Sequence, residues 1–347
     1  MSQPATLNNA RRDFYERIGS LSMAPLWESL HQLVPLRPTP RYQPACWSYD
    51  AVRPFLLEAG SLITAKEAVR RVLILENPAM PGSACITPTL YAGLQLILPG
   101  EVAPSHRHTQ SALRFIVEGE GAYTAVDGER TVMREGDFVI TPTWTWHDHG
   151  NESTRPMVWL DGLDIPLVAM FNAGFAENGE SDEQAVTSPE GTSDAKYASG
   201  LLPVDWKPAR QTSPIFNYPY VRTREALHRL AKAGPADACH GYKLRYVNPA
   251  NGGAPIATMG TFMQLLPKGF ETAPYRCTDG TVFSVVEGRG ESRIGDKTFR
   301  WKKRDHFVVP SWATAVHKAE DEAVLFSFSD RPVQERLDLW REDRSGH

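Results

Sequence analysis

PSHRHTQSALRFIVEGEGAY, residues 104–123, places two histidines one residue apart just before an apolar segment bounded by glycines. Side chains two residues apart on a strand point to the same side, so His106 and His108 can reach a common point. Histidine pairs of this kind occur in loops, in surface patches and in metal sites. The sequence around the stretch has to distinguish among these three.

Alternation with a period of two begins at Thr89 and continues on both sides of this stretch. In TLYAGLQLILPGE, residues 89–101, one face carries Tyr91, Gly93 and Gln95, and the other face carries leucines. Further strand-like segments follow at short intervals, with turn signals such as Asp127-Gly128 between them. Many short strands at even spacing predict a β-sandwich or a β-barrel.

The stretch is part of an internal repeat. ILPGEVAPSHRHTQSALRFIVEGEGAYTAVDGERTV returns later in the chain as LLPKGFETAPYRCTDGTVFSVVEGRGESRIGDKTF. At one constant offset, Gly100 falls on Gly269, and EGEG at 118–121 falls on EGRG at 287–290. A repeat of this length predicts two β domains of the same architecture.

His147 is the candidate for a third metal ligand, because it follows the strand-like segment GDFVITPTWTW in the same repeat unit. Three imidazoles suit a borderline divalent metal such as Fe(II), Zn(II), Mn(II) or Cu(II). The second copy of the repeat keeps the glycines and prolines but replaces the three histidines by Tyr275, Cys277 and Ala315. Histidines that served the fold would be needed in both copies, so the comparison favours a metal site in the first.

Composition excludes several classes of partner. The formal net charge of −4 argues against nucleic acid and anionic membranes, which bind proteins with an excess of Lys and Arg. No apolar run approaches the roughly 20 residues that span a bilayer, and the N-terminus lacks the apolar core of a secretory signal. The 4 cysteines show no CxxC spacing, which favours reduced thiols. We therefore expect a cytoplasmic protein that binds neither nucleic acid nor membranes.

The histidines lie in two motifs that resemble the cupin signatures. The pattern G-x5-H-x-H at 100–108 is similar to the first signature, and G-x5-P-x4-H-x3-N at 136–151 is similar to the second. The sequence departs from the cupin pattern at Ala112, where a glutamate ligand is usual, and at Trp144, where a glycine is usual. The resemblance implies a jelly-roll barrel with a metal at its mouth. Without the glutamate, three histidines would leave coordination positions open for substrate and oxygen.

With two such domains, and with the specific stretches HRHTQSALRF and TWTWHDHGN, nearly the whole chain resembles the gentisate 1,2-dioxygenase family. The family includes salicylate, substituted-salicylate and 1-hydroxy-2-naphthoate dioxygenases. The resemblance implies a mainly β, bicupin fold of two tandem jelly-roll β-barrels with an N-terminal helical arm. The expected parts are a helical and irregular arm (1–84), a metal-binding cupin (85–175), a linker with a short helix (176–254), a second cupin without metal (255–330) and a C-terminal helix (331–347).

The resemblance also implies a reaction. Members open the ring of gentisate between its carboxyl-bearing and hydroxyl-bearing carbons, with O2 and one Fe(II) per chain, to give maleylpyruvate. The implied partners are a small aromatic acid, O2 and other copies of the chain in a homotetramer. Salicylate, 5-substituted salicylates and 1-hydroxy-2-naphthoate are alternative substrates, and a non-enzymatic ligand-binding cupin is a more remote alternative.

Arg114 is the candidate that meets the substrate's carboxylate, because a guanidinium inside SALRFIV is costly to bury without an anionic partner. A structural ion pair with a nearby acid is the alternative. Gln95 matches a substrate-binding position of the family and is expected to point inward with Tyr91 and Gly93. A tyrosine at position 91 resembles the members that prefer gentisate, whereas a tryptophan resembles those that accept salicylate.

His149 points the same way as His147 but would crowd the metal as a fourth ligand. We expect it to hydrogen-bond the substrate hydroxyl or bound oxygen and to shuttle a proton. Its counterpart His317 persists in the copy without metal ligands, which leaves a structural role open. By resemblance to the family, Asp161 would orient His149 or a nearby tyrosine; a plain turn residue is the alternative.

Lys66 and Arg70 are four residues apart in a segment predicted to be helical from Thr64 onward. Residues four apart share one face of a helix. We therefore expect the two side chains to close the pocket over the carboxylate, with solvated surface charge as the alternative.

Overall fold

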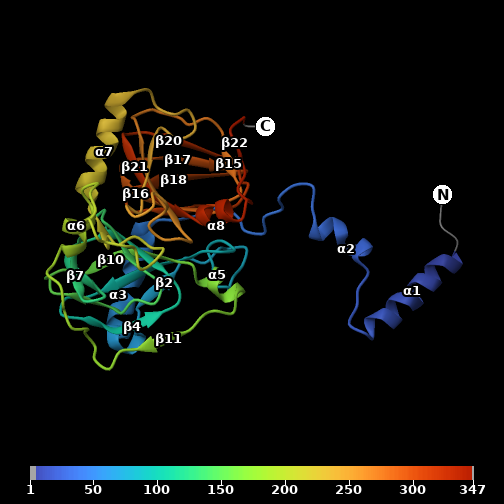
Figure 1. Cartoon of the computed structure of the whole chain (residues 1–347). Helices are drawn as coiled ribbons and strands as arrows, with labels where there is room; N and C mark the ends of the chain where they lie inside the picture. Colours follow the sequence, from blue (N-terminus) through green and yellow to red (C-terminus); the bar gives the residue numbers. More distant parts are fainter. Residues whose placement is uncertain (1–4, 346–347) are drawn as a thin grey trace. The chain divides into compact units, whose positions relative to one another are not determined.

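The computed structural model describes residues 5–345 and consists of two compact units, Met1–Thr39 and Pro40–His347 (Figure 1). The first unit contains helices α1 (Ala5–Gly19) and α2 (Leu26–Leu33). Trp27 Nε1 donates a hydrogen bond to the Tyr15 hydroxyl (2.8 Å), which in turn donates to Glu28. These polar contacts join the two helices, while α2 buries none of its residues.

The second unit contains two β-barrels of the same architecture. The first barrel is formed by two sheets with the strand orders β12-β8-β5-β10-β3-β2 and β11-β4-β9-β6-β7. Its strands are β2 (Val72–Ile74), β3 (Tyr91–Ile97), β4 (Val102–His108), β5 (Ala112–Glu118), β6 (Glu120–Val126), β7 (Glu129–Arg134), β8 (Phe138–Thr141), β9 (His147–Asn151), β10 (Met157–Leu163), β11 (Ala176–Asn178) and β12 (Asn217–Tyr218).

The second barrel has the sheets β1-β19-β16-β21-β14-β13 and β18-β17-β20, together with the strand pair β15-β22. Its strands are β1 (Ala45–Trp47), β13 (Tyr242–Arg245), β14 (Gly260–Leu266), β15 (Arg276–Cys277), β16 (Thr281–Glu287), β17 (Arg289–Ile294), β18 (Lys297–Lys302), β19 (His306–Val309), β20 (Ala315–Ala319), β21 (Ala323–Ser329) and β22 (Glu342–Asp343). The remaining helices of this unit are α3 (Tyr49–Leu62), α4 (Ala65–Ala68), α5 (Ile165–Met170), α6 (Thr192–Tyr197), α7 (Tyr220–Ala233) and α8 (Arg331–Arg336).

The repeat seen in the sequence is a repeat of strand order. The series β8-β5-β10-β3 in the first barrel corresponds to β19-β16-β21-β14 in the second. Gly100 and Gly269 occupy the same turn with φ of +77° and +76°, a left-handed conformation that favours glycine. Trp144 and Trp312 also share a positive φ, 58° and 60°. The prediction of a mainly β, bicupin fold is confirmed.

Short strands from outside the predicted barrel boundaries complete both large sheets. The predicted arm contributes β1 to the second barrel, where Ala45 lies opposite Val308, and β2 to the first. The predicted linker likewise contributes β12 to the first barrel and β13 to the second. The barrels therefore include residues of the predicted arm from Pro40 onward and residues of the predicted linker 176–254. The four strands concerned are only two to four residues long, which is too short to identify by periodicity.

The helix predicted over 331–347 is a correction, because α8 ends at Arg336. Asp338 adopts a positive φ of 56°, which a continuing helix cannot accommodate. The chain then forms β22, in which Asp343 lies opposite Arg276 of β15. By contrast, the short helix predicted within 176–254 is present as α7, which is capped by Gly234.

One hydrophobic cluster joins the two barrels. Phe115 of β5 stacks on Phe326 of β21, with ring centroids 4.1 Å apart and planes 6° apart. Alternate residues of the first barrel's strands form a separate cluster on the opposite face of the sheet, made of Ile97, Ile116, Ala122, Met133, Val139, Met157 and Trp159. One face of the first barrel's sheet thus forms an apolar cluster inside the barrel, and the other face packs against the second barrel. No helix among residues 5–345 is both long and apolar enough to cross a membrane.

His306 of β19 yields a prediction on stability. It is 0% exposed, and neither ring nitrogen has a hydrogen-bond partner within the described chain. Burial lowers its pKa from 6.5 to about 3, so the unfolded chain binds more protons between these values. The buried neutral imidazole therefore does not reduce the free energy of unfolding above pH 6.5, and it reduces it increasingly as the pH falls from 6.5 toward 3. The wild-type chain should lose free energy of unfolding when the pH is lowered from 7 to 4. In His306→Leu we expect this loss to be smaller by about 3 kcal/mol, as measured by urea denaturation at both pH values.

The matched control is His228→Leu, which replaces an exposed histidine on α7. It should leave the pH dependence of the wild-type chain unchanged. If the free energy of unfolding depended on pH equally in the wild-type and the His306→Leu proteins, buried His306 would not be a source of this pH dependence.

Candidate metal centre

Three histidines converge where β4 meets β9. His106 and His108 lie at the end of β4, His147 begins β9, and His106 lies opposite His147 in the antiparallel register. One ring nitrogen of each histidine lies within 4.8 Å of those of the other two. The ring centroids of His106 and His147 are 4.4 Å apart, and those of His108 and His147 are 4.8 Å apart. The three side chains thus share one point.

Backbone carbonyls orient two of the three rings. Nδ1 of His108 lies 2.8 Å from the carbonyl oxygen of Gln110, and Nδ1 of His147 lies 2.9 Å from that of Thr145. A carbonyl only accepts, so each Nδ1 carries the proton and each Nε2 keeps a free lone pair. Nε2 of His147 and Nδ1 of His106 are buried without a hydrogen-bond partner in the described chain.

The environment keeps these imidazoles neutral. Burial, followed by the charge of Arg70, lowers the pKa of His106 to about 2. Burial also lowers the pKa of His108 to about 4, with Arg114 and Arg70 adding to the effect, and holds that of His147 well below its usual value. Neutral imidazole is the form that binds metals. A convergent set of three neutral, partly pre-oriented nitrogen donors fits a divalent metal of borderline softness.

Arg114 of β5 is 3% exposed. Its Nε lies 3.7 Å from Oδ1 of Asp161, and its guanidinium also donates to the hydroxyl of Thr141. The Nε atom itself has no hydrogen-bond partner among the described residues. Arg114 therefore has the acidic neighbour expected for a structural ion pair, and it also keeps an unused donor that a substrate carboxylate could accept.

Asp161 of β10 lies between Gly93 and Arg114 in the sheet register. Its Oδ1 accepts a hydrogen bond of 3.0 Å from Trp159 Nε1. Burial raises the pKa of Asp161 to about 6, against the lowering effect of Arg114. In the described part of the chain Asp161 makes no hydrogen bond to His149 or to a tyrosine, so the structure does not support the predicted orienting role.

Arg70 reaches the site by a strained turn. Val69, directly after α4, has φ of +57°, an outlying conformation for a β-branched residue. Arg70 donates to the carbonyl oxygens of Val69 (2.8 Å) and Pro104 (3.1 Å), and its Nη2 is buried with no partner among residues 5–345. Burial, together with the neighbouring Arg114, lowers its pKa to about 9.

Lys66 does not lie beside Arg70 on a helix. The helix begins after Thr64 as predicted, with a capping box formed by Thr64 and Glu67, but α4 ends at Ala68, so Lys66 and Arg70 do not share a helical face. The ammonium of Lys66 is largely exposed and forms an ion pair of 2.7 Å with Asp182. The shared helical face is therefore absent, because the helix is too short, while a contact of Lys66 with the substrate stays a prediction.

Tyr91, Gly93 and Gln95 lie on the face of β3 that carries Arg114 and Asp161 on neighbouring strands, because residues directly opposite one another share a face. Tyr91 and Gln95 are both buried. A Cβ at Gly93 would come within 2.9 Å of the Tyr91 hydroxyl and 2.5 Å of Cγ1 of Val72. Only glycine fits beside the tyrosine at this point of the strand.

His149 is fully buried and is held by Thr124 of β6. The Thr124 hydroxyl lies 2.9 Å from Nδ1 of His149, and the Nε2 of this ring has no partner within the described residues. The second barrel contains the same arrangement, with Ser292 Oγ 2.7 Å from Nδ1 of His317. The hydroxyl–imidazole pair is therefore a property of both barrels, and only in the first does it lie beside three convergent histidines.

Sequence reasoning missed three residues that contact the predicted site, namely Thr124, Thr141 and Trp159. Thr124 lies opposite His149, and Thr141 lies opposite Ala112, two residues along the strand from Arg114. These pairings depend on strand register, which a single sequence does not reveal. The only available signal was the inward position of each residue in an alternating strand.

The fold and the three-histidine group define a bicupin protein with a metal-binding site in its first barrel. Residues 93–163 match the cupin domain family. The chain is 56% identical over 344 residues to gentisate 1,2 dioxygenase 1 of Aquipseudomonas alcaligenes, covering 99% of both chains. It is 39% identical over 343 residues to a gentisate 1,2-dioxygenase of Streptomyces sp., covering 96% of both.

A solved structure is similar over the full length. It is a tryptophan-to-tyrosine variant of salicylate 1,2-dioxygenase from Pseudoaminobacter salicylatoxidans in complex with gentisate, with a TM-score of 0.93, 36% identity, and coverage of 100% of this chain and 98% of that one. The chain belongs to the gentisate 1,2-dioxygenase family of ring-cleaving dioxygenases. It is therefore an oxidoreductase, and the alternative of a non-enzymatic cupin is set aside.

Proposed function

We propose that this chain opens the ring of gentisate between the carboxyl-bearing C1 and the hydroxyl-bearing C2, with O2 as co-substrate, to give maleylpyruvate. We further propose one Fe(II) per chain, held by His106, His108 and His147. The observation that carries the proposal is the presence of two guanidinium groups, the buried Arg114 and the partly buried Arg70, whose charges act on the three neutral imidazoles. The first barrel thus combines nitrogen donors for a metal with cations for an acid.

The charge balance of the barrel favours an anionic substrate. Arg114 has Asp161 as its acidic neighbour, and the other nearby acid, Asp148, accepts two hydrogen bonds from Gln184. The Nε of Arg114 and the Nη2 of Arg70 keep donors without partners in the described chain. A substrate carboxylate would satisfy these donors with charge-assisted hydrogen bonds and compensate the cost of burying two cations.

Fe(II) bound by three imidazoles supplies open coordination positions and the one-electron chemistry that lets triplet O2 react with a singlet ring. The chain's own residues bind and orient the acid. Arg114 and Arg70 hold the carboxylate, the Gln95 amide offers a hydrogen bond, and the neutral Nε2 of His149 accepts a proton from a ring hydroxyl. The apolar cluster around Trp159 excludes water from the inner side of the barrel.

Tyr91 supports gentisate over salicylate as the substrate. Its hydroxyl lies close to Gly93, on the face that carries Arg114 and Asp161. Gentisate has a second ring hydroxyl that a neighbouring polar group can contact, and that hydroxyl makes the ring easier to oxidise. Salicylate, a 5-substituted salicylate or 1-hydroxy-2-naphthoate is the second candidate, supported by the full-length similarity to a salicylate 1,2-dioxygenase.

The proposal is tested by oxygen uptake of the Fe(II)-loaded protein with gentisate, salicylate and a 5-substituted salicylate in parallel. We expect rapid uptake with gentisate and much slower uptake with the other acids. Uptake with none of them would overturn the proposed reaction. Comparable rates with salicylate would overturn the preference for gentisate, and loading the protein with Zn(II) should abolish uptake.

Thr124→Val tests the role of His149. Valine keeps the shape of threonine but removes the hydroxyl that bonds Nδ1, so the ring loses the partner that fixes its tautomer. We expect kcat for gentisate to fall about 10-fold with little change in KM, by analogy with the 10–100-fold cost of removing a partner that orients a functional histidine. Steady-state oxygen uptake measures both constants.

The matched control is Ser292→Ala, which removes the equivalent hydroxyl beside His317 in the second barrel. It should leave kcat near the wild-type value. If both variants lowered kcat equally, the hydroxyl–imidazole pair would serve only the fold.

Assembly and location form part of the same proposal. We propose a homotetramer in which the N-terminal helices contact other subunits. In support, α2 carries large exposed apolar side chains, including Trp27 at 63% exposure and Leu33 at 66%. A cytoplasmic location is supported by the free thiols of Cys46, Cys85, Cys239 and Cys277. Sedimentation of the chain with and without residues 1–39 tests the assembly.

A further inference from the structure

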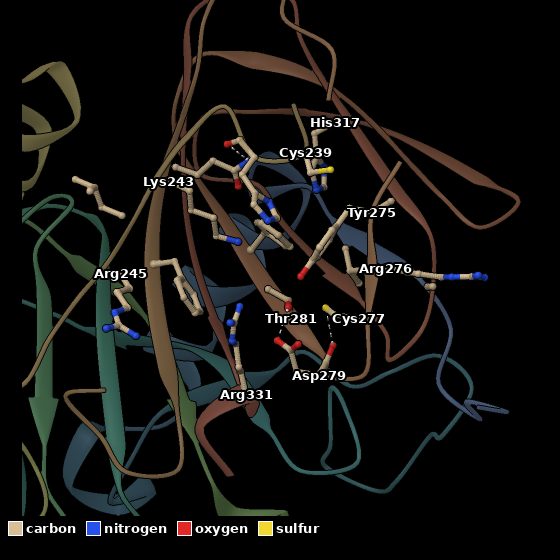
Figure 2. A pocket seen from close by; sticks show the side chains of 18 residues that line it. Cys239, Lys243, Arg245, Tyr275, Arg276, Cys277, Asp279, Thr281, His317 and Arg331 are labelled. Carbon is tan, nitrogen blue, oxygen red and sulfur yellow. Dashed lines mark hydrogen bonds between the residues drawn. The ribbon is translucent and has the colours of Figure 1, made fainter. Parts of the chain in front are cut away.

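The second barrel contains a cavity of about 250 Å³ (Figure 2). Its wall includes Tyr275, Cys277 and Ala315, which align with the three histidines of the first barrel, and also His317. The cavity thus occupies the position in the repeat at which the first barrel carries its metal-binding group. It remains open although the metal ligands have been replaced.

Lys243 distinguishes this cavity from its counterpart in the first barrel. It lies on β13 opposite Gln264, just as Val72 on β2 lies opposite Gln95 in the first barrel. The second barrel therefore has a cation where the first has an isopropyl group. Figure 2 shows the Lys243 side chain extending into the cavity, with Tyr275 across from it.

Among residues 8–345, the ammonium of Lys243 has no counter-ion. Its nitrogen lies 4.8 Å from the ring centroid of Phe262, and no carboxylate of the described residues lies within 4.0 Å of it. The nearest acid on the cavity wall, Asp279, accepts hydrogen bonds from Trp340 Nε1 (2.7 Å) and Thr281. An ammonium in a cavity is costly unless an anion accompanies it.

The other basic groups of the cavity are already accommodated. Arg331 pairs with Glu335 at 2.7 Å, and its guanidinium stacks on Trp340 at 3.8 Å. Burial lowers the pKa of His240 and of His317 to about 3, so both rings are neutral. Arg276 forms an ion pair of 2.7 Å with Asp343, and Arg245 is exposed at the rim. Lys243 is therefore the cation among these residues that an incoming anion would meet.

The rest of the wall is mainly apolar. Phe262, Phe283, Leu244 and Val309 line the cavity together with two alanines. A volume of about 250 Å³ is slightly below the range of roughly 300–1,000 Å³ that is typical of pockets for drug-sized ligands. The space therefore suits a ligand of the size of one substituted ring.

We propose that the second barrel is a binding site for a small organic carboxylate with an apolar body, in which the carboxylate pairs with the ammonium of Lys243 and the body packs against Phe262 and Phe283. The site is separate from the metal-binding barrel and does not depend on the reaction proposed for it. A chain whose first barrel failed to oxidise gentisate would still bind the acid in the second.

Crystals of the Fe(II)-loaded full chain soaked in 4-bromobenzoate locate the site directly, because bromine is found by its anomalous scattering. We expect one bromine in the second-barrel cavity, with the carboxylate at Lys243. In crystals of Lys243→Met this bromine should be absent. Bromine at the first barrel alone, or unchanged occupancy of the second cavity in Lys243→Met, would overturn the proposal.

Calorimetric titration tests binding in solution. We expect Lys243→Met to weaken the second-barrel binding of benzoate by at least tenfold and Lys243→Arg to restore most of it. Lys268→Met, which removes an exposed lysine of the same barrel, is the matched control and should bind as the wild type does. Benzamide, which lacks the charge, and inorganic phosphate, which lacks the apolar body, should both bind at least tenfold more weakly. Equal binding of benzoate and benzamide would contradict the assignment of Lys243 as the anchor.

Discussion

His108→Ala is expected to reduce the metal content of the purified protein more than about 10-fold, because even the loss of a residue that orients a metal ligand costs 10–100-fold in affinity, and to bring oxygen uptake with gentisate to background. The Nδ1 of this ring is committed to the Gln110 carbonyl, so its Nε2 is the donor that the metal would lose. No carboxylate belongs to the three-histidine group, so two imidazoles would remain. Metal analysis after loading with Fe(II), together with an oxygen electrode, measures both effects.

His228→Ala provides the matched control, since this histidine is exposed on α7. It should retain the metal content and oxygen uptake of the wild type. Thermal unfolding of both variants distinguishes loss of the site from loss of the fold. Full retention of iron by a folded His108→Ala protein would mean that the ligand set differs from the one proposed.

Arg114→Met should lower kcat/KM for gentisate by about 100-fold or more, mainly through KM. The substrate's carboxylate would lose its buried, charge-assisted hydrogen-bond partner, and truncation of one partner of such a pair costs about 2–5 kcal/mol or more. The variant is expected to be less stable as well, because Asp161 would remain buried without its cation. Oxygen uptake over a range of gentisate concentrations gives kcat and KM separately.

Two further variants separate binding from folding. The double variant Arg114→Met/Asp161→Asn removes the uncompensated charge, so it should regain stability while KM stays high. Arg71→Met removes an equally buried arginine that is paired with Glu101, and it should lose stability without a comparable rise in KM. If Arg71→Met and Arg114→Met raised KM to the same extent, the effect of Arg114 would be structural.

The three histidines were predictable because their spacing and the loss of all three in the repeat are visible in the letters of the sequence. Arg114 was predictable for a similar reason, since a charge inside an apolar strand is conspicuous. Thr124 and Trp159 were not, because their contacts with His149 and Asp161 follow from strand register. Register depends on which strands become neighbours, and that is decided by packing over the whole sheet.

The two errors of the helical predictions have a common physical origin. Both Lys66 and the segment after Arg336 carry helical periodicity, yet the helices end early at residues with positive φ, Val69 and Asp338. Neither residue is a glycine, so nothing in the local sequence marks the break. Tertiary contacts, such as the pairing of β22 with β15, overrule the local preference there.

The chain cannot be cut between the two barrels without separating paired strands, because β1, which precedes the first barrel, pairs within the second. A fragment that ends within residues 176–254 would retain β1 but lack β19, its partner in the second barrel. The complementary fragment would expose the open edge of β19, and an unpaired strand edge is a template for association with other chains. We expect the two halves expressed alone to aggregate, and co-expressed halves to assemble. We therefore expect that neither barrel folds as a separate module, because each sheet needs short strands from outside its own repeat unit.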